Sequence, residues 1–270
     1  MYLNGYQKIA VIFLGVLAIF WAVLWLTNTT EGFYNYLYSF LFGLIPLLAG
    51  VIAMFSGKSW GGFRTAIGKA VFFIGLGIFL WGCGETIWSY YNFFLGVAAP
   101  YPSLADLGFA PSVFFYGLGT FYLSQASGAK YGWRSKKAKV FAIILPIVIF
   151  AISYYLLVIV AREGVLVPEG ESLLKAFLDV VYPLGDFLSA TIATIITGLS
   201  FKYMGGLYRN NIIAVLLGLV VMFVADTIFS YTTTIGTYYN GNFGDLVLTI
   251  GVFLLSFGVL GFHKSTRARH

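Results

Sequence analysis

Acidic side chains inside long apolar segments are the residues of this 270-residue sequence that could do chemistry. Glu85 and Asp226 each lie near the middle of such a segment, and Asp186 lies in a third. An acidic side chain at the centre of a membrane costs about 2.5–3.5 kcal/mol on insertion scales. It is therefore protonated or paired, and it faces the interior of a helix bundle. Such residues could bind a cation, sense a proton or hold helices together.

Aromatic and polar residues recur beside two of these acids at helical spacing. They stand three, four and seven positions further on: Trp88, Ser89 and Asn92 after Glu85, and Phe229, Ser230 and Thr233 after Asp226. Aromatic faces attract cations, and Tyr231 would add a further ring. The pattern predicts a cavity with acidic and aromatic walls that opens to the outside. The alternative is interhelical glue, in which polar contacts contribute roughly 0.6 kcal/mol each.

Cysteine and histidine are too scarce for most other site chemistry. Cys83 is the single cysteine, which excludes an intrachain disulfide, and the two histidines, His263 and His270, stand near the C-terminal end. A bis-histidine haem and a histidine-rich zinc site inside the membrane are therefore excluded. No Walker A or complete dinucleotide motif is present, and a serine nucleophile would lack a histidine base. We expect no metal, no cofactor and no enzymatic activity.

The composition is that of a membrane protein. Apolar residues make up 60% of the chain and charged residues 10%, whereas soluble domains are about 25% charged. At about 20 residues per membrane helix, we expect an all-α polytopic protein with eight transmembrane helices. The apolar runs are residues 8–27, 34–55, 68–95, 104–126, 138–161, 173–201, 211–237 and 244–263. The lipid bilayer is then the main partner, and nucleic acid is not expected.

The distribution of basic residues sets the orientation. Of the 16 lysines and arginines, 14 fall in alternate connections and at the two chain ends, and the exceptions are Arg162 and Lys175. Basic residues collect on the cytoplasmic side. Both termini are therefore expected in the cytoplasm, in a multi-pass protein of the cell membrane. None of the ten acidic residues falls in a segment placed on the cytoplasmic side.

The chain repeats itself at long range. Glu85-Thr-Ile-Trp-Ser-Tyr-Tyr matches Asp226-Thr-Ile-Phe-Ser-Tyr-Thr, Asp106-Leu matches Asp245-Leu, and Pro46-Leu matches Pro183-Leu. These matches predict a tandem repeat of two four-helix units: 1–126, then a basic cytoplasmic linker at 127–137, then 138–270 with a short basic tail. Because four spans is an even number, the two units are parallel and related by a pseudo-twofold axis along the membrane normal.

Two further features concern helix starts and helix packing. Asp106 and Asp245 stand where spans begin and are interpreted as helix caps, with direct ligand contact as the alternative. Gly75, Gly77, Gly82 and Gly84 are expected to let the third span approach its neighbours closely.

One stretch resembles a known family. The helix end Glu85-Thr-Ile-Trp-Ser-Tyr-Tyr is followed by the loop Pro100-Tyr-Pro-Ser-Leu-Ala-Asp106. This order is similar to that in the multi-span N-terminal sensory regions that prokaryotes fuse to histidine kinases, PAS modules and diguanylate cyclases. The match covers about residues 85–125. The resemblance implies a membrane sensor module, here without an output domain.

Three functions remain open at this point. The first is a non-enzymatic sensor or ligand-binding module, in which the acids bind a proton or a small cationic ligand and a cytoplasmic or membrane partner carries the signal. The second is a secondary transporter coupled to protons or cations. The third is a structural subunit of a membrane complex, in which the acids only pack helices.

Overall fold

The computed structural model describes residues 3–127, 136–165, 170, 172–200 and 208–263. Within these ranges the chain forms eight α-helices of 18 residues or more and no strand, which confirms the all-α prediction. They are α1 (Gly5–Leu26), α2 (Phe33–Ser59), α3 (Ala66–Tyr90), α4 (Asp106–Ala126), α6 (Lys136–Tyr154), α7 (Leu173–Ser200), α8 (Arg209–Thr234) and α9 (Phe243–Leu260). Most of the predicted 127–137 linker and the basic tail lie outside the described residues.

Short π-helices continue two of these elements. Tyr91–Leu95 extends α3, and Tyr155–Val160 extends α6. The wider π turn changes the angular register of the residues that follow it. The Tyr155–Val160 segment contributes Leu157 to the wall of the cavity between the helices.

The helices have the dimensions and composition of membrane spans. Seven of them, all except α4, are long and apolar enough to cross a membrane. The protein is therefore a multi-pass membrane protein by fold. At 1.5 Å per residue, α4 is about 31 Å long, close to the thickness of the hydrocarbon core. It falls short in hydropathy because it carries Asp106, Gln125 and several serine, glycine and tyrosine residues.

Large apolar side chains cover the outside of the bundle. On α1, Ile12 is 68% exposed and Ile19 is 69% exposed, and on α6, Ile143 and Ile147 are 65% and 62% exposed. A soluble protein rarely leaves such a continuous apolar surface in water. In a bilayer the same side chains contact lipid.

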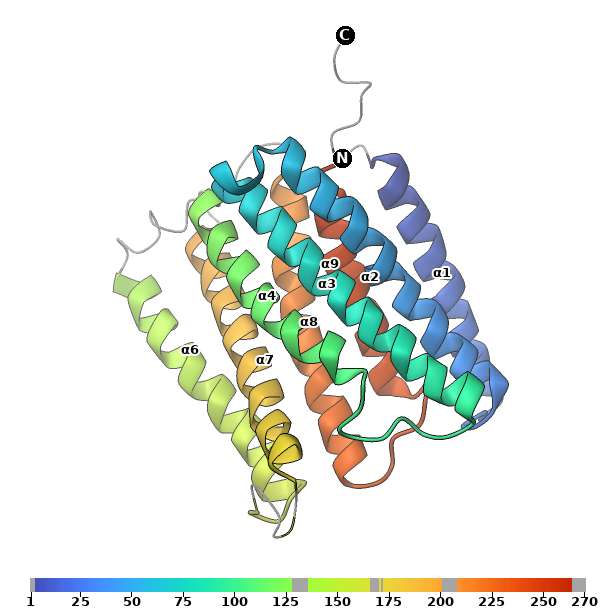
Figure 1. Cartoon of the computed structure of the whole chain (residues 1–270). Coiled ribbons are helices and arrows are strands. Elements are labelled where there is room, and N and C mark those ends of the chain that lie inside the picture. Colours follow the sequence, from blue (N-terminus) through green and yellow to red (C-terminus); the bar gives the residue numbers. More distant parts are fainter. Residues whose placement is uncertain (1–2, 128–135, 166–169, 171, 201–207, 264–270) are drawn as a thin grey trace.

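Successive helices run in opposite directions (Figure 1). As a result, α1 begins and α9 ends at the same end of the bundle, which we call the terminal end. The connections 27–32, 96–105 and 235–242 lie at the opposite end, which we call the cavity end.

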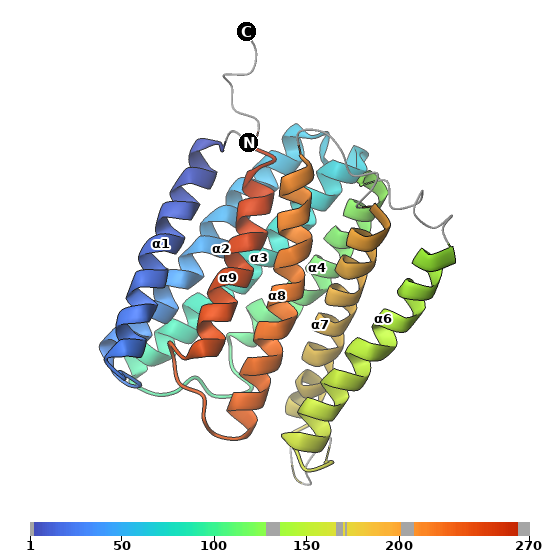
Figure 2. The same cartoon turned by 180° about the vertical axis from the view of Figure 1, so that it is seen from behind.

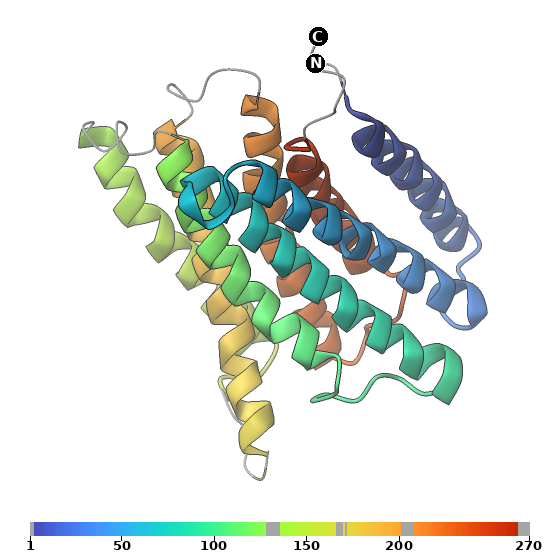
Figure 3. The ribbon, with the colours of Figure 1, turned by 45° about the horizontal axis from the view of Figure 1, so that its top comes forward.

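The bundle has two layers of three helices. One layer contains α2, α3 and α4, and the other contains α9, α8 and α7 behind it (Figures 1 and 2). Across the layers, α2 packs on α9 and α4 packs on α7. The flanking helices α1 and α6 lie at opposite edges, α1 against α9 and α2, and α6 against α7 (Figure 3).

Glycines bring the helices of the first layer close together. A Cβ at Gly75 or Gly82 would collide with α2, and one at Gly77 or Gly84 would collide with side chains of α4. The expectation that these four glycines serve close packing is therefore confirmed. Small residues are the usual means by which membrane helices approach each other.

The tightest of these approaches predicts a specific loss of stability. A Cβ at Gly108 of α4 would lie 2.5 Å from the backbone nitrogen of Gly84 and the carbonyl oxygen of Leu80. Gly108→Ala should therefore lower the free energy of unfolding by about 1–3 kcal/mol, as overpacking does. Gly117→Ala is the matched control, because a Cβ at Gly117 meets no atom within 4 Å. Thermal unfolding in detergent measures both, and equal stability of the two variants would contradict the packing assignment.

Candidate functional site

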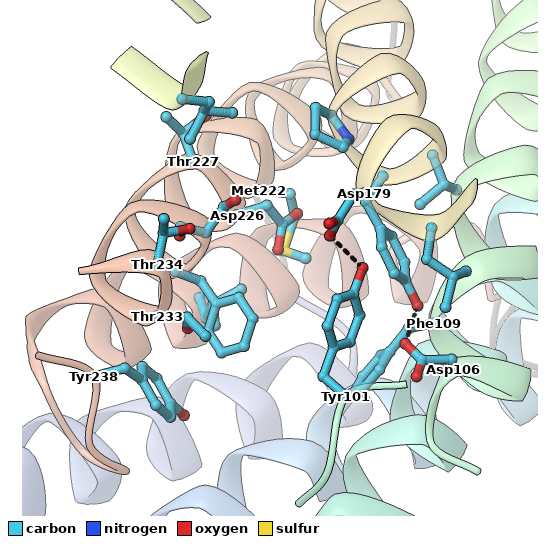
Figure 4. A pocket seen from close by; sticks show the side chains of 18 of the residues that line it. Tyr101, Asp106, Phe109, Asp179, Met222, Asp226, Thr227, Thr233, Thr234 and Tyr238 are labelled. Atoms are coloured by element: carbon cyan, nitrogen blue, oxygen red, sulfur yellow. Dashed lines mark hydrogen bonds between the residues drawn. The ribbon is translucent and has the colours of Figure 1, made fainter. Parts of the chain in front are cut away.

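A cavity of about 550 Å³ opens between the two layers at the cavity end (Figure 4). Its walls come mainly from α3, α4, α7 and α8, with contributions from α6, α9 and the 99–103 and 162–165 segments. The helices α3 and α8 do not pack closely on each other, and the cavity occupies the space between them. Its volume lies in the range of small-molecule sites, about 300–1,000 Å³.

Most of the residues expected from the sequence lie in this wall. They are Glu85, Trp88, Asp226, Phe229, Ser230 and Thr233. Both central acids thus reach one cavity, as the repeat suggested. Asp186 lies on α7, but its side chain lies outside the part of the chain that the structure describes.

Three expected residues do not line the cavity. The cavity face of α3 contains Trp81, Glu85 and Trp88. Ser89 is the next residue after Trp88 and lies beside this face, not on it. Asn92 stands in the π-helix and its amide lies beside the Trp88 indole and the Val97 carbonyl. Tyr231 is five residues after Asp226, which places it on the far side of α8.

Glu85 is held by the neighbouring helix α2. Its side chain lies over Gly43, where a Cβ would come within 2.5 Å of Glu85 Cγ. Ser39 donates a hydrogen bond of 2.6 Å to Glu85 Oε1, and Glu85 is only 5% exposed. The partner is thus a hydroxyl, and it comes from α2 and not from Ser89 or Asn92 of the same helical segment. This contact also has the form of interhelical glue.

Asp106 and Asp245 occupy matching places and both line the cavity. The Asp106 carboxylate accepts from the Ser103 backbone N–H at 2.6 Å and from the Tyr182 hydroxyl at 2.5 Å. Asp245 accepts from the Gly241 N–H at 2.6 Å and from the Tyr238 hydroxyl. Each carboxylate of the first turn thus accepts a backbone N–H at the start of its helix, as the capping interpretation expected, although the N-cap residues themselves are Ala105 and Asn242. The same hydrogen bonds fix the preceding loops.

The cap of α9 is provided by a different residue. Asn242 Oδ1 accepts the Asp245 backbone N–H at 3.0 Å. On α4 no side chain caps the first turn. With the helix start satisfied by Asn242, the Asp245 carboxylate turns back toward the loop and the cavity wall.

Asp179 forms an ion pair in the cavity wall. Arg162 Nη2 lies 3.5 Å from Asp179 Oδ1, and the Tyr101 hydroxyl donates to the same oxygen at 2.9 Å. Lys175 stands four residues before Asp179 on α7, close enough on a helix to pair with it. Arg162 takes that place because the turn after the π-helix brings it to the start of α7.

Two tyrosines outside the spans remain protonated donors. Burial raises the pKa of Tyr238 well above its ordinary value, and the carboxylates of Asp245 and Glu85 raise it further. Burial also raises the pKa of Tyr101, with the neighbouring Asp179 as the next cause. Both phenols therefore donate to carboxylates across the physiological pH range.

Asp226 differs from the other four carboxylates of the wall. No described residue donates a hydrogen bond to it, and it lies on α8 across the cavity from Asp179 and Tyr101 (Figure 4). The aromatic rings nearest to it close the wall between α3 and α8. Trp88 and Phe229 are 5.9 Å apart between centroids, and Phe229 and Tyr238 are 4.8 Å apart.

The sequence alone did not identify the basic residues of the cavity wall or several of its hydroxyl groups. These residues include Tyr101, Ser153, Arg162, Lys175, Tyr182 and Tyr238. Their common signal is position, since most stand in or next to the connections at the cavity end. Arg162 and Lys175 had one more signal, because they are the two of the 16 lysines and arginines that fall outside the alternate connections and the chain ends.

Comparison of the chain with protein-family models, curated proteins and solved structures finds no match in any of the three.

The Ser39–Glu85 contact predicts a measurable difference between two buried serines. Ser39→Ala removes the donor to a buried carboxylate and should cost about 1–3 kcal/mol of stability. Ser256→Ala is the control, because Ser256 is fully buried and its Oγ has no partner among the described residues. Unfolding of both variants in the same detergent tests the contact. A Ser39→Ala variant as stable as Ser256→Ala would show that the bond contributes nothing.

Proposed function

We propose that the chain is an eight-span membrane protein with both termini in the cytoplasm. The 14 basic residues in alternate segments support this orientation, and the length of α4 supports an eighth span. In this orientation the cavity end faces the outside of the cell membrane.

We also propose that the bundle is a tandem repeat with a pseudo-twofold axis along the membrane normal. The pairing of α2 with α9 is reciprocated by the pairing of α7 with α4, as such an axis requires. Glu85 and Asp226 line one cavity, and Asp106 and Asp245 each bind the loop before their helix. These matched environments support duplication over chance similarity of apolar helices.

We infer that the cavity binds a small cationic ligand from the outer side, and that the protein is a non-enzymatic sensor or ligand-binding module. The observation that carries this proposal is Asp226, a carboxylate in a polar and aromatic cavity with no donor from the described residues. A carboxylate in this environment is stabilised by a cation or a proton. The surrounding rings favour an organic cation over a small hydrated ion.

A secondary transporter is the alternative, because transporters bind substrates between two repeats near the midplane. The floor of the cavity argues for access from one side only. Tyr116 and Met222 lie near the middle of α4 and α8. Beyond them the bundle is filled by buried apolar residues such as Ile74, Leu219 and Leu255. A one-sided cavity is what a sensor needs.

The resemblance of residues 85–125 to prokaryotic sensory regions supports the same proposal. In this proposal a cytoplasmic or membrane partner carries the signal. The terminal end, where the predicted basic segments lie, is the place for such a contact.

Binding of organic amines tests the function directly. Primary and quaternary amines, with phenethylamine and tetramethylammonium as first probes, should raise the melting temperature of the purified protein. A ligand at 100 times its Kd stabilises the folded state by about 2.7 kcal/mol. Asp226→Asn keeps the shape of the side chain. It should raise at least tenfold the amine concentration that gives the same increase in melting temperature.

Glu31→Gln is the matched control, because Glu31 is an exposed acid of an outer connection. It should leave the response to amines unchanged. If neither amines nor protons alter stability through Asp226, the acids are structural and the third function, a subunit of a membrane complex, is the better account.

A further inference from the structure

The two basic residues on the predicted outer side share one location. Of the 16 lysines and arginines, only Arg162 and Lys175 depart from the cytoplasmic pattern, and both line the cavity. Orientation rules give them no role there. Their placement therefore points to the cavity itself.

Arg162 has capacity for another partner. Its side chain is 15% exposed, and its one ion pair joins Nη2 to Asp179 Oδ1 at 3.5 Å. That distance is longer than a good hydrogen bond, and the same oxygen already accepts from Tyr101. A guanidinium carries five N–H donors, and none makes a hydrogen bond to a described residue. Arg162 therefore has donors available for an acceptor in the cavity.

A second unsatisfied group lies in the same wall. Ser153 of α6 lines the cavity and is 8% exposed, yet its Oγ has no partner among the described residues. A buried hydroxyl without a partner costs about 1–3 kcal/mol. Ser153 and Arg162 both belong to the segment formed by α6, its π-helical extension and the turn that follows. Asp226 and Ser230 belong to α8.

We infer that the ligand of this cavity is amphoteric, with an ammonium group held at Asp226 and a carboxylate held at Arg162. The inference rests on the proposed function, since it assigns a second group to the ligand of the same site. A carboxylate matches the planar donor fork of arginine, and Ser153 can donate to a second ligand oxygen. The aromatic wall residues, Trp81, Phe109 and Phe223 among them, take the apolar part of the molecule.

Matched sets of probes test the ligand class. Each common amino acid is measured beside its decarboxylated amine and its deaminated acid, for example phenylalanine, phenethylamine and 3-phenylpropanoate. Thermal shifts of the purified full chain give an apparent Kd for each. The best amino acid should bind at least tenfold more tightly than its own amine and its own acid.

Variants then assign the two groups. In the Arg162→Gln variant the amino acid should bind no more tightly than its amine, whose own apparent Kd should not change. In the Asp226→Asn variant the amino acid should bind no more tightly than its deaminated acid. Because Arg162→Gln leaves Asp179 without its ion pair, Arg162→Gln combined with Asp179→Asn provides a neutral version. Arg64→Gln is the control, because Arg64 is exposed at the terminal end.

The outcomes separate the two proposals. If amines bind as tightly as their amino acids, and Arg162→Gln changes neither, the amphoteric ligand is wrong while the cationic site stands. If Arg162→Gln weakens amines and amino acids equally, Arg162 has only a structural role and the inference also fails. If no probe of any class binds, both this inference and the proposed function are overturned.

Discussion

A carboxylate between membrane helices must be met by a donor, a cation or a proton, and the cavity of this protein is organised around that requirement. Glu85, Asp106, Asp179 and Asp245 are each met by groups of the protein itself. Each of these contacts joins different segments: α2 to α3, the 99–105 loop to α4 and α7, and the 236–242 loop to α9. The acids therefore hold the cavity end together, and Asp226 is left facing the cavity.

The packing of the first layer makes the cavity possible. Glycines bring α2, α3 and α4 into close backbone contact, and α8 and α9 are similarly close through Gly218, Gly251 and Gly258. The first layer and the α8–α9 pair are therefore tightly packed. Between the layers, α2 meets α9 and α4 meets α7, and the centre between α3 and α8 stays open at the cavity end. Small residues thus determine where space remains for polar side chains.

The sequence predicted the helices and the central acids well, because both depend on local pattern. The length of an apolar segment defines a membrane span, and an acidic side chain inside a span faces the interior of the bundle. The sequence predicted the hydrogen-bond and ion-pair partners of these acids poorly, because such contacts depend on which helices become neighbours. Nothing near Glu85 in the chain indicates that Ser39 is its hydrogen-bond partner. Arg162 lies close to Asp179 because of the turn that follows the Tyr155–Val160 π-helix. The expectation that Ser89 and Asn92 line the cavity with Glu85 failed because Ser89 lies beside the cavity face of α3 and Asn92 stands in the π-helix.

Access to the cavity tests the central claim most directly. Ser230→Cys, in a Cys83→Ser background, places a thiol in the cavity wall beside Asp226. Intact cells are treated from outside with a cationic thiosulfonate (the ethyltrimethylammonium reagent) or an anionic one (the ethylsulfonate). Gln125→Cys at the terminal end serves as control. The account predicts that the Ser230→Cys thiol is modified from outside, at least tenfold faster by the cationic reagent, and that the Gln125→Cys thiol is modified only once the membrane is permeabilised. Equal rates for the two charges, or labelling of the Ser230→Cys variant only after permeabilisation, would contradict it.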